Sequence, residues 1–271
     1  MEEAHALLRW KTSLQNHNNG SLLSSWTLNN VTKTSPFAWV GIHCNRGGRV
    51  DSINLTSIGL KGMLHDFSFS SFPHMVYLDL WPTLYLYHNS LSDSIPSELG
   101  NLRSLSTLSL GYNKLSGSIP HSLGNLTNLA TLYIHTNSLS GSILGEIGNL
   151  RFLSDLELSN NKLSGLIPPS LGNLSNLATL YLDNNSLSDL IPSELGNLSG
   201  SIPHSLGNLT NLATLYIYSN SLSASIQGEI RNLKSLSNLA LTNNKLSGSI
   251  PPSLGNLSNL VKYKYATQEG G

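Results

Sequence analysis

"LSTLSLGYNKL" (residues 105–115), "LATLYIHTNSL" (129–139) and "LSDLELSNNKL" (153–163) share one frame, in which alternating apolar residues precede an asparagine. The asparagine recurs every 24 residues on either side of one break: Asn113, Asn137, Asn161, Asn185, then Asn220 and Asn244. A fixed period of this length indicates a repeat protein in which each unit is one coil. The 271-residue chain is therefore predicted to form one elongated solenoid.

Each repeat is expected to contain one short strand. Alternating apolar positions such as Leu108 and Leu110 indicate a strand with one buried face. A Gly-x-Ile-Pro segment follows, as in "GSIP" at 117–120. Proline lacks a backbone donor and glycine permits positive φ, so we expect this segment to end the strand and turn the chain back. Successive strands then stack in parallel about 4.8 Å apart and bury the leucines.

The recurring asparagine is expected to be structural. It lies where the strand ends, and its amide can satisfy backbone groups of its own turn and of the next coil. The predicted structural residues are Asn89, Asn113, Asn137, Asn161, Asn185, Asn220 and Asn244.

Composition excludes several classes of function. Charged residues make up only 11% of the chain, and 15 basic residues balance 15 acidic ones, so no basic surface indicates nucleic acid or an anionic membrane. No apolar run reaches the roughly 18 residues that cross a bilayer. The start "MEEAHALLRWKTSL" does not read as a signal peptide. The single cysteine, Cys44, excludes an intramolecular disulfide and is interpreted as a small buried hydrophobe.

The chain contains no convincing catalytic or metal-binding motif. His121 and His204 occupy the same position in two copies of "IPHSLGN", so we interpret them as repeated surface residues rather than ligands. There is no G-x-S-x-G elbow and no set of kinase motifs. We therefore expect no enzyme activity, no cofactor and no metal.

The frame resembles plant-type leucine-rich repeat proteins, whose repeats have this length and the G-x-I-P segment. Residues 1–50, with Trp26 and "WVGIHC", resemble the N-terminal cap of receptor-like kinases, and 51–271 resemble the repeats. The run "INLTSIGLKGMLHDFSFSSFPHMVYLDL" (53–80) is most similar to the male-discoverer-interacting branch. The resemblance implies an α/β repeat fold: a right-handed solenoid with a parallel concave β-sheet and a helical N-terminal cap.

The pattern departs from the family at several places. The cap usually has two cysteines, but Phe37 stands at the first position, so we expect the cap to fray or to be compensated by packing of Phe37. Residues 191–208 lack a strand and its asparagine, and we expect them to bulge while the strand at 177–185 pairs directly with that at 212–220. Within 75–89 either Leu78/Leu80 or Leu84/Leu86 could form the strand, and Asn89 favours the second pair. No C-terminal capping repeat is expected.

The outward-facing strand positions carry the candidate binding site. Tyrosines on an open sheet offer amphipathic contact area of the kind found at binding hot spots, although β-propensity on a solvated face explains them equally simply. Acidic neighbours favour a basic or hydroxyl-rich peptide. The predicted ligand-binding residues are Tyr85, Tyr87, Tyr133, His135, Asp155, Glu157, Tyr181, Asp183, Tyr216 and Tyr218.

N-x-S/T sequons favour an extracellular location, although many follow from the repeat consensus itself. The candidate glycosylation sites are Asn19, Asn30, Asn54, Asn125, Asn173, Asn184, Asn197, Asn208 and Asn256. With the resemblance, they imply an extracellular or plasma-membrane-associated parent protein.

The resulting prediction is a recognition module that binds a secreted peptide or protein ligand, with a leucine-rich repeat kinase as possible co-receptor. Nucleic acid and direct membrane insertion of this chain are not expected. Two alternatives remain open: a soluble defence protein of the polygalacturonase-inhibitor type, and a non-functional receptor gene fragment.

Overall fold

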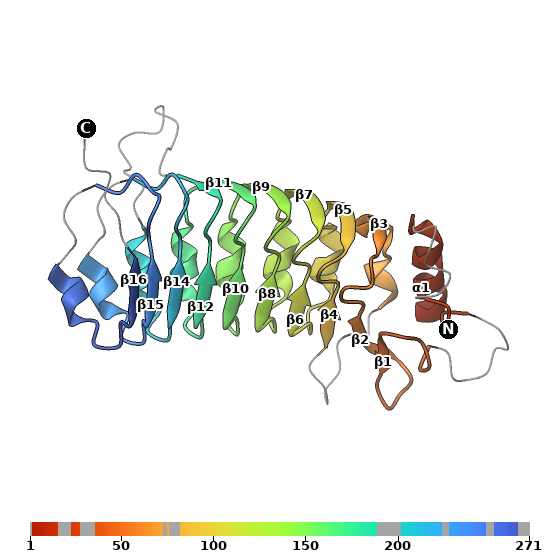
Figure 1. Cartoon of the computed structure of the whole chain (residues 1–271). Helices are drawn as coiled ribbons and strands as arrows, with labels where there is room; N and C mark the ends of the chain where they lie inside the picture. Colours follow the sequence, from red (N-terminus) through yellow and green to blue (C-terminus); the bar gives the residue numbers. More distant parts are fainter. Residues whose placement is uncertain are drawn as a thin grey trace.

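The molecule is one solenoid of stacked coils that runs from an N-terminal helix to the last strand (Figure 1). The computed structural model describes residues 2–15, 23–27, 36–72, 75, 82–188, 202–223, 228–247 and 252–264. The helix, α1 (Glu2–Ser13), lies at the N-terminal end and belongs to the cap. One continuous leucine core extends from the cap through all coils.

A ten-stranded sheet, here called the concave sheet, forms one side of the solenoid. Its strands are, in spatial order, β1 (Ile42–Cys44), β2 (Val50–Asn54), β4 (Thr83–Tyr85), β6 (Thr107–Ser109), β8 (Thr131–Tyr133), β10 (Asp155–Glu157), β12 (Thr179–Tyr181), β14 (Thr214–Tyr216), β15 (Asn238–Ala240) and β16 (Lys262–Lys264). Strands β1 and β2 pair antiparallel, and the later pairs are parallel. Central residues such as Leu132 and Leu156 are fully buried, which confirms the expected leucine columns.

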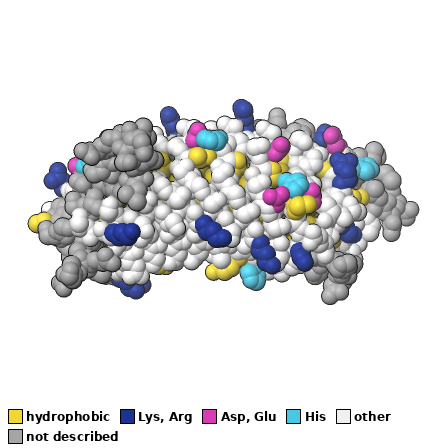
Figure 2. Space-filling model, turned by 90° about the horizontal axis from the view of Figure 1, so that it is seen from above, with side chains coloured by type: hydrophobic (Ala, Val, Ile, Leu, Met, Phe, Trp, Pro, Cys, Tyr) yellow, Lys and Arg dark blue, Asp and Glu magenta, His cyan; other side chains and the backbone are white. Residues whose placement is uncertain are grey.

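The Gly-x-Ile-Pro segment ends a strand and leads into a turn, as expected, but that strand is a second one in each coil, which was not predicted. The residues between the asparagine and Ile-Pro form a second, six-stranded parallel sheet of β3 (Lys61–Met63), β5 (Ser90–Ser94), β7 (Lys114–Ser118), β9 (Ser138–Ser142), β11 (Lys162–Gly165) and β13 (Ser186–Leu187). Gly117, at φ 73°, lies inside β7, which ends one residue later, whereas Gly165, at φ 72°, is the last residue of β11. Figure 2 looks onto the side at the top of Figure 1 and shows a mostly uncharged surface there.

A 3-10 turn completes each coil and supplies the helical part of the repeat. These turns are η1 (Leu64–Asp66), η2 (Phe69–Ser71), η3 (Ser97–Asn101), η4 (His121–Asn125), η5 (Gly145–Asn149), η6 (Pro169–Asn173), η8 (His204–Asn208), η9 (Gly228–Asn232) and η10 (Pro252–Asn256). In η4 the glycine, Gly124, packs so closely on the next coil that an added Cβ would lie 2.7 Å from the Glu146 backbone oxygen. The glycine of this turn thus follows from close stacking of backbones.

Replacing Asp93 by glycine is expected to stabilise the fold by about 0.5 kcal/mol. Asp93 has φ 71° at the repeat position where Gly117, Gly141 and Gly165 stand, and a side chain there strains the backbone. Its only compensation among the described residues is an exposed pair with His65, Oδ2 to Nδ1 at 2.8 Å. Urea unfolding of Asp93→Gly measures the balance, with His65→Ala as the control that removes the pair, together with the contact of His65 to Asp66 at 3.3 Å, and leaves the strain at Asp93. A lower urea midpoint for Asp93→Gly than for the unmodified chain would mean that the pair outweighs the strain.

The recurring asparagines form a hydrogen-bonded ladder, as predicted, but the ladder points to the preceding coil rather than to the next. Asn161 is representative: its Nδ2 donates to the carbonyls of Ile134, Leu158 and Ser159 at 3.1–3.3 Å. Its Oδ1 accepts the amide of Leu139 at 3.0 Å. Each asparagine thus ties its own turn to the coil before it.

The break in the repeat is bridged by direct strand pairing, as expected. Thr179–Tyr181 pairs in parallel with Thr214–Tyr216. The ladder also continues, because Nδ2 of Asn220 donates to the carbonyl of Leu182 at 3.0 Å. Within 191–208, residues 191–201 lie outside the described residues. In the other irregular segment, β4 contains Leu84 as the Asn89 frame predicted, whereas Leu78 and Leu80 lie outside the described residues.

Buried aromatic contacts hold the cap together without a disulfide. The rings of Trp26 and Trp39 stack at 5.6 Å, and the indole Nε1 of Trp26 donates to the carbonyl of Val40 at 2.9 Å. The expected compensation by Phe37 is wrong, since 47% of this residue is exposed. Phe37 stands beside the turn at Gly48 instead of entering the core.

Cys44 is a partly buried residue that packs against the core. Burial, reinforced by the negative charges of Glu3 and Asp51, raises its pKa from 9.0 to about 12. The reactive thiolate is therefore scarce at neutral pH, in line with the interpretation as a hydrophobe.

Candidate functional site

The outward-facing side of the concave sheet brings the predicted ligand-binding residues together in regular columns. The strand pairing places Tyr85, Tyr133, Glu157, Tyr181 and Tyr216 in one column. Nine of the ten predicted residues are half-buried, and Asp183 is the exception at 4% exposed. The columns follow from the period, because each coil adds one strand in unchanged register.

His135 is the centre of an aromatic cluster near the N-terminal half of the sheet. Its ring contacts Tyr112 edge-on at 5.4 Å and Tyr87 at 5.9 Å, and Tyr87 contacts Tyr112 at 5.3 Å. The ring lies over Gly111, where a Cβ would approach it to 2.8 Å, so only glycine leaves room for it. Tyr112 was not among the predicted residues. The sequence could have indicated Tyr112 through its position directly before Asn113. The backbone there has positive φ, 53° at Tyr112, and directs the side chain to the edge of the sheet.

An acidic patch of Asp155 and Glu157 adjoins this cluster on β10. Oε2 of Glu157 lies 3.0 Å from Nδ1 of His135, but the geometry does not satisfy a hydrogen bond. The pKa of Tyr133 is raised to about 12 by burial and by the charges of Asp155 and Glu157. Tyr133 therefore stays a neutral donor beside two carboxylates.

Tyr181 and Tyr216 form a stacked pair farther along the sheet. Their ring centroids are 4.9 Å apart and their planes differ by 19°. Tyr218 hydrogen-bonds to the carboxylate of Asp183, which also accepts the side-chain amide of Asn184 at 3.0 Å. Burial raises the pKa of Asp183 despite these hydrogen bonds. Asp183 thus hydrogen-bonds to Tyr218. Its outward-facing position had suggested a carboxylate at the surface, but the carboxylate is buried.

A hollow of about 500 Å³ opens at the C-terminal end of the concave sheet. Tyr216 and Tyr218 line it together with Ala240 and the exposed lysines Lys262 and Lys264 of β16. The lysines were not predicted as site residues, although Lys264 belongs to the tyrosine column. The site is therefore acidic at its centre and basic at this end.

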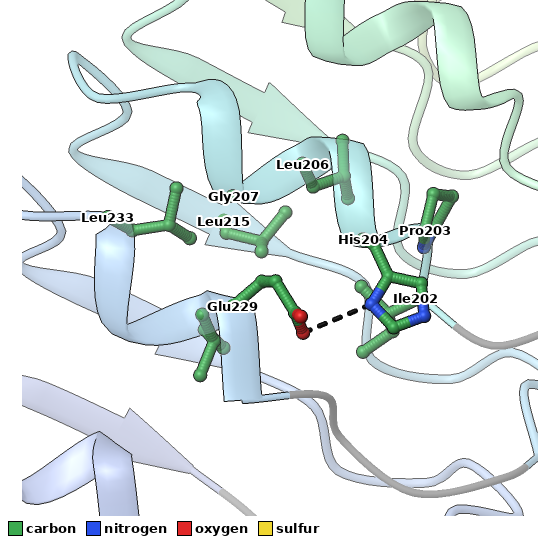
Figure 3. A pocket seen from close by; sticks show the side chains of 9 residues that line it. Ile202, Pro203, His204, Leu206, Gly207, Leu215, Glu229 and Leu233 are labelled. Atoms are coloured by element: carbon green, nitrogen blue, oxygen red, sulfur yellow. Dashed lines mark ion pairs between the residues drawn. The ribbon is translucent and has the colours of Figure 1, made fainter.

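The repeated histidines form inter-coil ion pairs. Nδ1 of His121 lies 3.0 Å from Oε1 of Glu146, and Nδ1 of His204 lies 3.0 Å from Oε2 of Glu229. Each histidine lowers the pKa of its glutamate, and both pairs are exposed. Figure 3 shows the second pair among the residues that line a small, mostly apolar pocket of about 20 Å³ between η8 and η9. That is room for about one water molecule, so the pocket is a packing gap rather than a ligand site.

The described ranges contain no group of three or more histidine, cysteine or acidic side chains that could hold a metal ion. Across the same residues, no helix combines the length and the apolar character that a membrane span needs.

The sequons that the structure describes differ in position. Asn125, Asn173, Asn208 and Asn256 are exposed at the ends of η4, η6, η8 and η10, outside the concave sheet. Asn54 ends β2 in the tyrosine column, and Asn184 is half-buried against Asp183. Asn19, Asn30 and Asn197 lie outside the described residues.

Two family models match the chain. The leucine rich repeat N-terminal domain matches residues 2–45. The leucine rich repeat matches 83–102, 104–126, 128–150, 152–174, 176–198 and 235–257. A curated relative, MDIS1-interacting receptor like kinase 2 of Arabidopsis thaliana, is 41% identical over 80 residues, which are 30% of this chain and 8% of the relative.

Solved plant receptor ectodomains have the same fold. The ectodomain of the Arabidopsis thaliana membrane receptor kinase GASSHO1/SCHENGEN3, in complex with CASPARIAN STRIP INTEGRITY FACTOR 2, superposes with a TM-score of 0.74 at 33% identity, over 94% of this chain and 31% of that one. The Arabidopsis receptor kinase HAESA, in complex with the peptide hormone IDA and the co-receptor SERK1, gives 0.70 at 37% identity, over 96% and 44%. The chain spans about 8% of the length of the first curated relatives. The chain belongs to the leucine-rich repeat proteins, with a leucine rich repeat N-terminal domain ahead of the repeats, and is homologous to the ectodomains of plant leucine-rich repeat receptor-like kinases.

Proposed function

We propose that the concave sheet binds a secreted peptide and that the chain is the extracellular recognition part of a plant receptor. The observation that carries this proposal is the column of half-buried tyrosines on an open sheet, flanked by the acidic patch. Half-buried tyrosines lose little side-chain entropy on binding and offer both ring contacts and hydroxyl donors. The family neighbours in complex with peptides support the same type of ligand.

The charges favour one class of peptide. Asp155 and Glu157 lie at the centre of the sheet and would attract a basic or hydroxyl-rich segment. The nine parallel strands from β2 to β16 span about 38 Å at 4.8 Å per spacing, enough for about eleven extended residues. Glycans on Asn125, Asn173, Asn208 and Asn256 would leave this face uncovered.

A random decapeptide library displayed on yeast provides the test. Peptides selected on the full chain are expected to be enriched in basic residues and to lose more than about a hundredfold in affinity when Tyr133, Tyr181 and Tyr216 are all changed to alanine, about 3 kcal/mol in total. The matched control is Ser116→Ala with Ser164→Ala, two exposed positions on the second sheet. Binders that tolerate the triple change would place the site elsewhere.

The co-receptor and the location of the parent protein follow from the same proposal. A leucine-rich repeat kinase would join the complex once peptide is bound, and the parent protein would expose these repeats outside the plasma membrane. Peptide-dependent association with such a kinase ectodomain supports this reading. Inhibition of a fungal pectinase in the absence of any peptide would instead support a polygalacturonase-inhibitor type of protein.

A further inference from the structure

Coils that carry a tyrosine in the tyrosine column alternate along the chain with coils that do not. Tyr85, Tyr133 and Tyr181 lie 48 residues apart, and the coils between them carry Ser109 and Glu157 at the same position. The next tyrosine, Tyr216, follows after only 216 − 181 = 35 residues. The break in the repeat therefore removes a coil of the kind that lacks tyrosine.

This loss creates the stacked tyrosine pair. Regular alternation separates the tyrosines by two strand spacings, about 9.6 Å, which is too far for ring stacking. Across the break, Tyr181 and Tyr216 are direct partners on neighbouring strands and their rings stack at 4.9 Å. The same step places Tyr218 beside Asp183, whose carboxylate it hydrogen-bonds. The ring of Tyr216 is thus held by neighbours on the β12 side.

The opposite side of Tyr216 borders the hollow. Strand β15 is the next neighbour of β14, and it places Ala240, 7% exposed, beside Tyr216. A small residue here leaves the hollow of about 500 Å³ open, with Lys262 and Lys264 lining it from β16. Neither lysine forms an ion pair with any residue in the described ranges. Its size lies within the usual range of ligand pockets, about 300–1,000 Å³.

We propose that this hollow is a subsite for an aromatic ring flanked by a carboxylate. The ring would extend the tyrosine stack over Ala240, and the carboxylate would reach the ammonium groups of Lys262 and Lys264. Thr242 lines the hollow as well and adds a hydroxyl to it. The subsite rests on the proposed peptide recognition and specifies one ligand residue: an aromatic side chain next to an acidic residue or at a free chain end.

Three small probes test the chemistry by ligand-observed NMR titration at millimolar concentration. N-acetyl-phenylalanine carries a terminal carboxylate, N-acetyl-phenylalanyl-aspartyl amide carries a side-chain carboxylate, and N-acetyl-phenylalanine amide carries none. We expect at least one acidic probe to bind about fivefold more tightly than the neutral amide, since exposed ion pairs contribute up to that much. The acidic probe that binds more tightly shows whether the carboxylate comes from a chain end or from a side chain.

Variants separate the parts of the subsite. Lys262→Gln with Lys264→Gln should abolish the preference for acidic probes, and Ala240→Leu should weaken binding of all three, because its side chain takes the place of the probe ring beside Tyr216. Tyr216→Ala should weaken all three about fivefold, whereas Tyr133→Ala, in the same column but away from the hollow, should have no effect. Thermal melting confirms that each variant is folded.

The proposal is overturned if no probe binds, if the three bind equally, or if Ala240→Leu leaves binding unchanged. If library peptides bind the concave sheet while the probes do not, the subsite alone fails. If the probes bind and no library peptide does, the proposed peptide recognition fails instead.

Discussion

Asn161→Leu is expected to destabilise the protein by about 3 kcal/mol, because it removes both directions of hydrogen bonding at once. The amide of Leu139 loses its acceptor, and the carbonyls of Ile134, Leu158 and Ser159 lose their shared donor. These groups lie between stacked coils, where water cannot replace the lost partner without opening the stack. At about 2 to 4 °C per kcal/mol, the melting temperature should fall by about 6 to 12 °C.

Asn176→Leu is the matched control for this prediction. Asn176 lies in the following coil and also bridges coils, since its Nδ2 donates to the carbonyl of Arg151 at 2.9 Å, but it does so at the exposed surface. Its replacement should change stability by less than about 1 kcal/mol. Equal melting temperatures for the two variants would show that the ladder asparagines contribute no more than surface hydrogen bonds.

Trp10→Ala is expected to cost about 3–5 kcal/mol, and the cost should fall mainly on the cap. Trp10 is fully buried and contacts Phe67 edge-on at 4.8 Å, and Phe67 stacks on Phe72 at 5.0 Å. The tryptophan thereby fastens α1 to the first coils. Because each unit of a solenoid is stabilised chiefly by its immediate neighbours, a cavity here should release the end of the array before its middle.

Hydrogen exchange measures this effect locally. Amides of α1 and β2 should exchange faster in Trp10→Ala, while those of β8 to β12 keep their protection. Trp10→Phe, which retains most of the buried area, should show a smaller change, and Phe152→Ala, at 61% exposed, should show almost none. Faster exchange along the whole chain would mean that the cap and the repeats unfold as one cooperative unit.

Much of the fold was predictable because it repeats. A 24-residue period with buried leucines admits only stacked coils, and the unbroken frame on both sides of 191–208 predicted that β12 and β14 pair directly. The asparagine ladder followed from the same reasoning. The second sheet was missed because Gly117 and its equivalents looked like strand breakers. Gly117 nevertheless has positive φ and still pairs with Leu139 of the neighbouring coil.

The candidate site was predicted less completely. The period determined which residues share a column, since that depends only on register. It did not determine contacts between columns, because these depend on the rotamers of side chains from several coils. Tyr112 and the burial of Asp183 were missed for this reason, and so was the exposure of Phe37.

From its sequence alone this protein was determined to be a solenoid with an open face of tyrosines, because a repeated pattern fixes which residues are buried between identical neighbours. Only the tertiary structure decided where that face is hollowed. The hollow beside Tyr216 exists because the small Ala240 of β15 lies between the tyrosine of β14 and the two lysines of β16, on three successive strands whose outward side chains differ from coil to coil. The contacts among residues that depart from the repeat pattern cannot be predicted from the pattern itself.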